Sequence, residues 1–455
     1  GLLGSAQLDQ NSIASSRELL NRFVSFYSNA SYTYDDKYVL SGSIRWDRSN
    51  LWGTNSKYQN KPLWSVGGSW NIYKEKFFQA DFVDMLKLRA SYGIGGNIGR
   101  NTAPYLIASY YDSSLVDGMA GAVNTPPNKD IRWEKTTTVN VGVDFALFRH
   151  RLSGTIEYYN KYSVDLLAAI NGSPTQGFGY TTLMTNNGKM VNRGVEITLS
   201  GEIIRQKDFS WNASLLYAFN RNKVKHISVQ PSLWDSRISM PTSYPMVGKP
   251  LYGIYAYKWA GLNENGDPQV YDAENNVTSG PARDYHALVY CGTTVPIHNA
   301  SLTNVLRYKG FEFSAMLILD AGHKLRSSNI PSINMSNGRI TSTAKGIVDR
   351  WTQPGDVTDV PRLLFSNDTE NFNTHRTELY RYSDLFVYDA SNIRLSNISL
   401  AYRVPAHWCK KISLSGARLQ FNVENVATFA FDSKANYDLG GKVKPNYVWG
   451  LYLNF

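Results

Sequence analysis

The chain has 455 residues and a formal net charge of +10; aromatic residues make up 13% of it and charged residues only 18%. A charged fraction below the typical value of about 25%, combined with many aromatic residues, favours strands that have one face in lipid and the other in water. The sequence excludes membrane-spanning helices, which need about 20 consecutive apolar residues, and it shows no basic stripe or motif typical of nucleic-acid binding.

The first 21 residues are expected to be a fragment start or a loop, followed by one large unit over residues 22–455. The chain opens on Gly1 rather than on an initiator methionine, and its first residues lack the basic region and apolar core of a signal peptide. The positive charge is interpreted as Lys and Arg scattered over loops. A basic surface that faces anionic lipid or substrate is the alternative.

Apolar residues alternate with polar ones in segments of about ten residues, which is the pattern of a membrane β-barrel. In residues 37–47, KYVLSGSIRWD, Leu40, Ile44 and Trp46 share one face and Ser43 and Arg45 share the other. Similar alternation recurs in 208–220, 139–147, 195–199 and 419–423, and it places Asp144, Glu196 and Glu424 on the polar face. We therefore expect an all-β fold, a transmembrane antiparallel β-barrel.

Turn residues divide the connections into two kinds. Tight turns are expected at 34–38, 148–152, 204–209 and 308–311. Long loops, expected on the extracellular side, cover 94–133, 166–190, 223–250 and 321–391. Short turns at one rim and long loops at the other are typical of bacterial outer-membrane barrels.

A count of strand direction gives about 15 strands if a weak one is included at 268–274, PQVYDAE. An odd number makes the first and last strands run in the same direction. Since bacterial barrels of one chain close with an even number of strands, this barrel needs strands that lie outside the sequence.

The last ten residues, NYVWGLYLNF, form the sharpest local feature. Their alternate residues make an unbroken apolar face that ends on an aromatic residue: Tyr447, Trp449, Leu451, Leu453 and Phe455. This ending resembles the signal that the barrel-insertion machinery reads, and an ordinary last strand is the alternative.

Nearly the whole chain resembles the SusC/RagA family of TonB-dependent outer-membrane transporters. The resemblance rests on the order and spacing of several stretches: DDKYVLSGSIRWDRSN, LWSVGGSWNIYKEKFF, LKLRASYGIGGN, NKDIRWEKTTTVNVGVDFALFRHRLSGTIEYYNK, NNGKMVNRGVEITLSG, GKPLYGIYAYKWAGLNENGDP, YKGFEFS, RWTQPGDVTDVPR and SNIRLSNISLAYRVP.

The resemblance implies a barrel of about 22 strands with an N-terminal plug, so the plug and about seven strands are missing from this chain. It implies a place in the bacterial outer membrane, in contact with the lipid bilayer and lipopolysaccharide. It also implies two partners: a SusD-like surface lipoprotein that acts as a lid, and the TonB complex, reached through the missing N-terminal part. The expected function is TonB-driven import of a nutrient, most readily glycan oligomers and next oligopeptides. A passive porin or structural barrel is the rival class.

No enzymatic, metal or cofactor site is expected. The seven histidines are dispersed and the glycines of GIGGNIG, at 93–99, fail the spacing of a dinucleotide-binding motif. Polar outward strand faces, which a soluble all-β enzyme or lectin would need, are missing. Four aromatic residues in the long loops are candidates for contact with substrate or lid, with loop packing as the alternative: Trp234, Tyr244, Tyr285 and Trp351. Whether Cys291 and Cys409 pair is left open.

Overall fold

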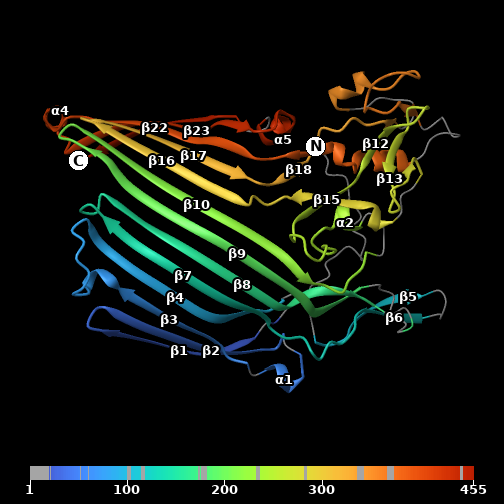
Figure 1. Ribbon diagram of the computed structural model, residues 1–455, viewed down its shortest axis with the longest axis horizontal. Helices are drawn as coiled ribbons and strands as arrows, with labels where there is room; N and C mark the ends of the chain where they lie inside the picture. The colour runs from blue at the N-terminus through green and yellow to red at the C-terminus, as the bar shows by residue number, and fades with distance from the viewer. Residues whose placement is uncertain are drawn as a thin grey trace, which may run out of the picture.

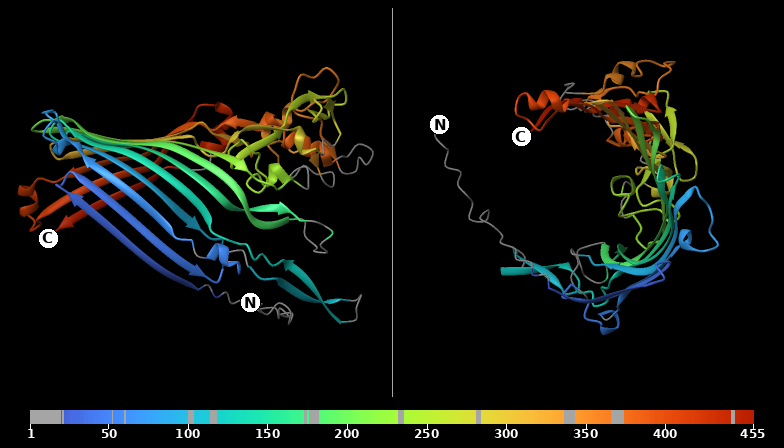
Figure 2. Two further views of the ribbon diagram at one scale, coloured as in Figure 1. Left: turned by 60° about the horizontal axis from the view of Figure 1, so that its bottom comes forward. Right: turned by 90° about the vertical axis from the view of Figure 1, so that its left-hand side faces the viewer.

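The structure, a computed structural model, describes residues 20, 22–51, 53–59, 61–99, 104–113, 118–172, 175, 182–231, 236–280, 284–335, 343–365, 374–440 and 444–455. One large antiparallel sheet dominates it and curls through an open arc when viewed end-on (Figure 2). In these parts of the chain, none of the helices has the length and apolar character to cross a membrane.

The large sheet has thirteen strands in the described ranges, and their order in space follows their order in the chain. The strands are β1 (Phe23–Tyr34), β2 (Tyr38–Ser49), β3 (Leu63–Asn71), β4 (Val83–Asn97), β7 (Glu134–Leu147), β8 (Leu152–Asn171), β9 (Thr182–Arg205), β10 (Phe209–His226), β16 (His298–Tyr308), β17 (Phe311–Ala321), β22 (Asn392–Arg403), β23 (Gly416–Ala430) and β24 (Asn446–Asn454).

The strand register confirms the predicted two faces. Ile44 lies opposite Trp64, which lies opposite Ile94, so apolar side chains continue from strand to strand on one face. On the other face, the hydroxyls of Ser43 and Ser65 lie 2.7 Å apart in a hydrogen bond. The three predicted carboxylates, Asp144, Glu196 and Glu424, all lie on this polar face. Because lipid cannot satisfy such groups, the polar face is the inner one.

The predicted tight turns all lie at one end of the sheet, which we call the short-turn rim. The turns at 35–37, 148–151, 206–208 and 309–310 join strands that are neighbours in the sheet. Phe148, Arg149 and His150 all have positive φ, as does Lys309, so these turns are tightly wound. The connections 72–82 and 404–415 also lie at this rim, and the other connections of the large sheet lie at the opposite end, the long-loop rim. Figure 1 shows the two ends, with α4 (Ala406–Lys410) at the short-turn rim.

The strand predicted at 268–274 is not part of the large sheet. β13 (Pro268–Tyr271) pairs with β12 (Trp259–Leu262) and β14 (Val277–Thr278) in a separate small sheet. The large sheet therefore has thirteen strands in the described ranges instead of about 15, and the predicted odd parity is unchanged. A short alternating segment cannot show from sequence alone which sheet it joins.

Two of the predicted long loops differ from the structure. Most of 166–190 is strand, because β8 continues to Asn171 and β9 begins at Thr182. The segment 94–133 contains the rest of β4 and a hairpin of β5 (Ile107–Ser113) and β6 (Gly118–Thr125). The polar and small residues that suggested loops here are compatible with strands that extend beyond the membrane.

The two longest connections, between β10 and β16 and between β17 and β22, fold together at the long-loop rim (Figure 1). We call the described parts of residues 236–297 and 323–391 the loop domain. Besides β12 to β14 it contains α2 (Ser236–Ser239), β11 (Gly253–Tyr257), β15 (Leu288–Thr293), β18 (Lys324–Arg326), β19 (Asn334–Met335), β20 (Leu364–Phe365), α3 (Thr374–Arg381) and β21 (Val387–Asp389). Elsewhere lie α1 (Ser56–Gln59) and α5 (Asn436–Gly440).

The loop domain holds the largest buried apolar clusters of the described chain. Tyr255, Tyr257 and Leu379 belong to one cluster, and Ile333 and Tyr380 belong to a second. The thirteen strands of the large sheet, which we call the wall, bury little apolar surface by comparison. One face of the wall meets lipid and the other meets the lumen, the space inside the barrel. The loop domain therefore has a core of its own, as a folded unit requires.

Candidate functional site

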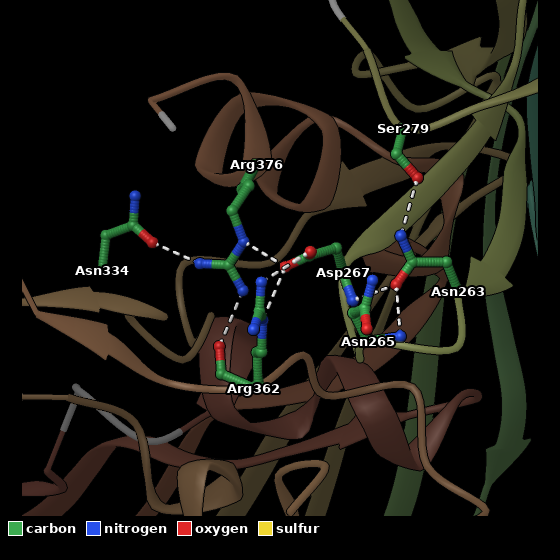
Figure 3. A network of polar contacts seen from close by, with 7 residues as sticks. All are labelled: Asn263, Asn265, Asp267, Ser279, Asn334, Arg362 and Arg376. Atoms are coloured by element: carbon green, nitrogen blue, oxygen red, sulfur yellow. Dashed lines mark hydrogen bonds and ion pairs between the residues drawn. The ribbon is translucent and has the colours of Figure 1, made fainter. Parts of the chain in front are cut away.

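A network of charged residues fixes the loop domain around Asp267 (Figure 3). The guanidinium of Arg362 donates from Nε and Nη2 to the two oxygens of Asp267, at 3.0 and 2.9 Å. Arg376, which is 3% exposed, donates from Nε to the same carboxylate at 2.6 Å and from Nη1 to Asn334. Burial lowers the pKa of Arg376 and the charge of Asp267 opposes that shift. The network joins four segments of the chain.

The turn that presents Asp267 is shaped by its own residues. The side-chain oxygen of Asn263 accepts hydrogen bonds from the backbone N–H groups of Asn265 and Asp267, and its amide donates to Ser279. Gly266 has φ +72°, and a Cβ there would lie 2.4 Å from the indole of Trp351. Glycine is thus required both for the turn and for the close approach of Trp351.

A second arginine, Arg326, joins the two halves of the loop domain. It donates from Nη2 to the carbonyl of Tyr255 at 2.6 Å, and from Nη1 to the carbonyls of Arg381 and Ser383. Arg381 is the last residue of α3, so the cation lies where the helix dipole is negative. Burial lowers the pKa of Arg326.

A pocket of about 360 Å³ lies where the loop domain meets the wall. Met190 and Val224 line it and share the inner face of β9 and β10 with Asn192. The described residues of the lining are mainly aliphatic and include no Phe, Tyr or Trp: Glu134, Leu166, Leu167, Ala168, Ala169, Met184, Gly188, Lys189, Met190, Val224, His226, Ile227, Thr242, Ser243, Pro245 and Leu251. It combines an apolar surface with a few polar groups at its edge, as small-ligand sites do.

Two of the polar side chains that line the pocket already have hydrogen-bond partners within the protein. Both oxygens of Glu134 accept hydrogen bonds, one from the backbone N–H of Leu167 at 2.8 Å and one from the amide of Asn97 at 2.9 Å. His226 has a hydroxyl partner, Ser228, at 3.3 Å. Lys189 takes part in no ion pair of the described chain. The pocket can therefore bind an apolar group and offer one cation to a polar end.

The inner wall below the pocket carries a separate charged cluster. Arg89 donates to both oxygens of Asp144, at 2.7 and 2.9 Å, and also to Glu157. Thr155 donates to Asp144 at 2.9 Å. Glu157 lies directly opposite Glu196 across β8 and β9, an arrangement of like charges that one nearby arginine partly compensates.

Of the four aromatic residues predicted for ligand or lid contact, three lie within the packed loop domain. The carbonyl of Tyr244 accepts a hydrogen bond from Arg237, and the ring of Tyr285 lies 4.9 Å from the same guanidinium. Trp351 packs against Gly266, while Trp234 lies outside the described residues. The structure brings Tyr244 and Tyr285 together around Arg237, and ligand contact stays a prediction for all four.

The C-terminal residues form β24, paired along its length with β23. The ring of Trp449 lies 4.2 Å from that of Phe421 on the outer face. Phe455 is 92% exposed and follows the last paired residue, Asn454. The five residues Tyr447, Trp449, Leu451, Leu453 and Phe455 stand on one exposed face, and their role as an assembly signal stays a prediction.

The described residues bear on metal binding and on the pairing of the two cysteines. No three His, Cys, Asp or Glu side chains in these ranges gather as a metal site. Asp356 accepts hydrogen bonds from the backbone of Thr352 and Gln353 and from the hydroxyl of Thr352. Cys291 and Cys409 are both free thiols, the first in β15 and the second in α4.

Sequence reasoning missed the Asp267 network and the pocket. Arg362 and Arg376 lie 95 and 109 positions from Asp267, and no periodicity links residues so far apart. The string NGDP, at 265–268, contains turn-forming residues and carries no sign of the partners of Asp267. All of the aliphatic pocket residues except Leu251 lie in 166–190 and 223–250, which the sequence predicts as loops.

Comparison with known proteins identifies a family that matches most of the chain. The family described as TonB dependent receptor-like, beta-barrel, matches residues 5–426. TonB-dependent receptor P3 of Formosa agariphila is 27% identical over 456 residues, which cover 94% of this chain and 43% of that protein. TonB-dependent receptor SusC of Bacteroides thetaiotaomicron is 25% identical and is matched over 89% of this chain and 40% of its own length.

Among solved structures, that of the RagAB peptide transporter has a TM-score of 0.76 and 23% sequence identity, and the match covers 96% of this chain and 48% of that one. The same transporter in an open state has a TM-score of 0.74. Because the sequence identity to these structures is only 23%, the similarity shows the fold alone. The chain spans less than half the length of the relatives it matches.

Proposed function

We propose, since this chain belongs to the TonB dependent receptor-like β-barrel family, that it forms the wall and outer loops of a TonB-driven nutrient importer. The chain is part of an outer-membrane protein. The plug and the contact with TonB are assigned to the rest of that protein. The observation that carries the proposal is the two-faced sheet of thirteen strands with the loop domain at one end.

The two edges of the sheet support this assignment. In the described ranges, β1 pairs only with β2, and β24 pairs only with β23. An unpaired strand edge within lipid leaves backbone groups without partners, at a cost of several kcal/mol each. We therefore propose that both edges pair with strands of the same protein and close the barrel.

The cargo that the pocket favours is an oligopeptide, which reverses the order expected from sequence. Sugar rings bind well against the faces of Phe, Tyr and Trp, and the described lining of the pocket beneath the loop domain contains none of these residues. An aliphatic lining suits an apolar side chain, and Lys189 at its edge suits a carboxylate. Glycan oligomers remain the second candidate, supported by the exposed aromatic residues Tyr110 and Tyr111 of the β5–β6 hairpin.

The same hairpin supports a lid partner. Tyr105, Tyr110 and Met119 are 62%, 72% and 69% exposed, and apolar residues gathered on a surface in this way indicate a binding site for protein. We propose that a SusD-like lipoprotein covers them. Deleting residues 107–125 from the full-length protein should abolish co-purification of the lipoprotein while leaving the barrel folded.

Uptake by cells carrying the full-length protein tests the function. Labelled oligopeptides and glycan oligomers are supplied separately, with and without depletion of TonB. Active import predicts uptake of one class that stops when TonB is removed, whereas a passive porin predicts uptake that continues. A Met190→Trp variant, which fills the pocket, should lower peptide uptake with little effect on folding. Leu216→Trp, on the inner face outside the pocket, is the control.

A further inference from the structure

We infer that the short-turn rim carries a binding site for anionic phospholipid headgroups. The site, which we call the rim patch, consists of three basic residues, Lys207, Lys309 and Arg403, and three aromatic residues, Tyr308, Phe311 and Tyr402. The inference is independent of the cargo and of TonB, because it rests on the membrane-facing end of the wall alone.

Backbone hydrogen bonds bring the three basic residues together. The N–H of Lys309 donates to the carbonyl of Asp208 at 2.9 Å, which joins the turn after β9 to the turn after β16. The N–H of Arg403 donates to the carbonyl of Gly310 at 2.8 Å. A Cβ on Gly310 would lie 2.8 Å from the carbonyl oxygen of Arg403, so the two segments touch. Residues from three hairpins thus form one surface.

The charges of this surface are uncompensated. Lys207, Lys309 and Arg403 are all exposed, and none forms an ion pair with another described residue. Asp208 is the one acidic residue in the turns concerned. By contrast, the basic Lys37 of the first turn is paired with Asp35 at 2.6 Å. The rim patch therefore keeps a net positive charge for a ligand.

The aromatic residues place the patch at the depth of lipid headgroups. Tyr308, Phe311 and Tyr402 point to the outer, lipid-facing side, and the rings of Phe311 and Tyr402 lie 4.5 Å apart. Tyr308 and Phe311 are 53% and 50% exposed. Other aromatic residues continue the row along this rim: Tyr34, Tyr38, Trp70, Phe77, Phe82 and Phe148. Such a girdle marks the boundary between hydrocarbon and headgroups.

Lys207 and Lys309 lie in the turns just beyond this girdle, at the depth where the phosphates of lipids lie, and Arg403 is the last residue of β22 at the same rim. Lys309 Nζ lies 5.3 Å from the centre of the Tyr308 ring, which holds its charge beside the girdle. Lysine and arginine are the residues that bind phosphate oxygens. A phospholipid with a net negative charge satisfies both parts of the patch, with its phosphate on the cations and its acyl chains along the aromatic rings.

The test is a titration of the full-length protein, purified in mild detergent, with phosphatidylglycerol and, separately, with the neutral phosphatidylethanolamine, followed by native mass spectrometry. The variant replaces Lys207, Lys309 and Arg403 with Gln. Each surface charge contributes about fivefold to binding of anionic lipid, so the triple variant should bind phosphatidylglycerol at least about tenfold more weakly. Binding of phosphatidylethanolamine should not change.

Two further variants make the result specific. Lys207→Arg, Lys309→Arg and Arg403→Lys together should keep the affinity, because they keep the charge. Lys345→Gln, Arg350→Gln and Lys444→Gln together remove three exposed basic residues near the long-loop rim and should also have no effect. Heat-modifiable migration on gels checks that each barrel is folded. If the triple variant does not fold, single Lys309→Gln and the salt dependence of the native protein decide the question.

Any of five outcomes overturns the inference. The triple variant binds phosphatidylglycerol within twofold of the native protein, or the control variant loses as much, or the charge-keeping variant loses affinity too. Inorganic phosphate at millimolar concentration should compete poorly, and complete competition would show a free anion site without a lipid role. Loss of co-purified lipopolysaccharide in place of phospholipid would assign the rim to the other leaflet and also refute the proposal.

Discussion

Removing the charge of Asp267 should open the loop domain and leave the wall intact. Asp267→Asn keeps the shape of the side chain but leaves Arg376, whose side chain is 4% exposed, without its carboxylate. Breaking a buried pair from one side typically costs about 3–5 kcal/mol, because the remaining charge stays buried. Arg362, with a side-chain exposure of 23%, can turn toward water and adds less.

The assay is hydrogen–deuterium exchange of the full-length protein in detergent. A loss of about 3–5 kcal/mol raises the exchange rate of amides that open locally by more than about 100-fold. The increase should appear in β13 and α3 and be absent from β8 and β9. Asn276→Asp, in the turn between β13 and β14, is a control that changes charge outside the network.

A double variant separates the charge from the contacts. Asp267→Asn with Arg376→Met removes both charges, and replacing a buried ion pair with apolar groups is often neutral. The double variant should therefore exchange more slowly than Asp267→Asn alone. Native-like exchange in the single variant, or faster exchange throughout the wall, would refute the view of Asp267 as the local anchor.

Three other predictions concern single residues. A Cβ at Gly194 would lie 2.4 Å from the ring of Tyr159 and 2.6 Å from a backbone oxygen. Gly194→Ala should therefore cost about 1–3 kcal/mol of folding stability and lower the temperature at which the folded barrel changes to the unfolded form on gels. Gly95→Ala, where a Cβ meets nothing within 4 Å, is the control. Burial raises the pKa of the Cys291 thiol to about 11, so iodoacetamide at pH 8 should label native protein slowly and unfolded protein fast, and equal rates would contradict this assignment. Phe455→Ala should slow barrel insertion in cells while leaving the melting temperature of protein already inserted nearly unchanged, because the side chain is 92% exposed; a large loss of thermal stability would instead assign Phe455 a packing role.

The wall was predictable because its physics is local. Leu40, Ile44 and Trp46 must face lipid and Ser43 and Arg45 must face water, so the period of two is written into the sequence. The turns were predictable for a similar reason, since adjacent strands need a short link. The length of β8 and β9 was not, because beyond the membrane both faces are polar and the alternation disappears.

The loop domain follows a different rule, and this explains why its site escaped prediction. Its stability depends on hydrogen bonds between residues that are far apart in the sequence, such as Asp267 with Arg376 and Arg326 with the carbonyl of Tyr255. Each of these residues is ordinary in its own neighbourhood, and a buried arginine has the same local sequence as an exposed one. The sequence shows each aromatic residue of the loops separately, whereas the position of Tyr285 depends on its contact with Arg237. The proposed recognition site thus lies in the part whose fold depends least on local sequence pattern, while the wall that carries it follows from a local pattern along most of its length.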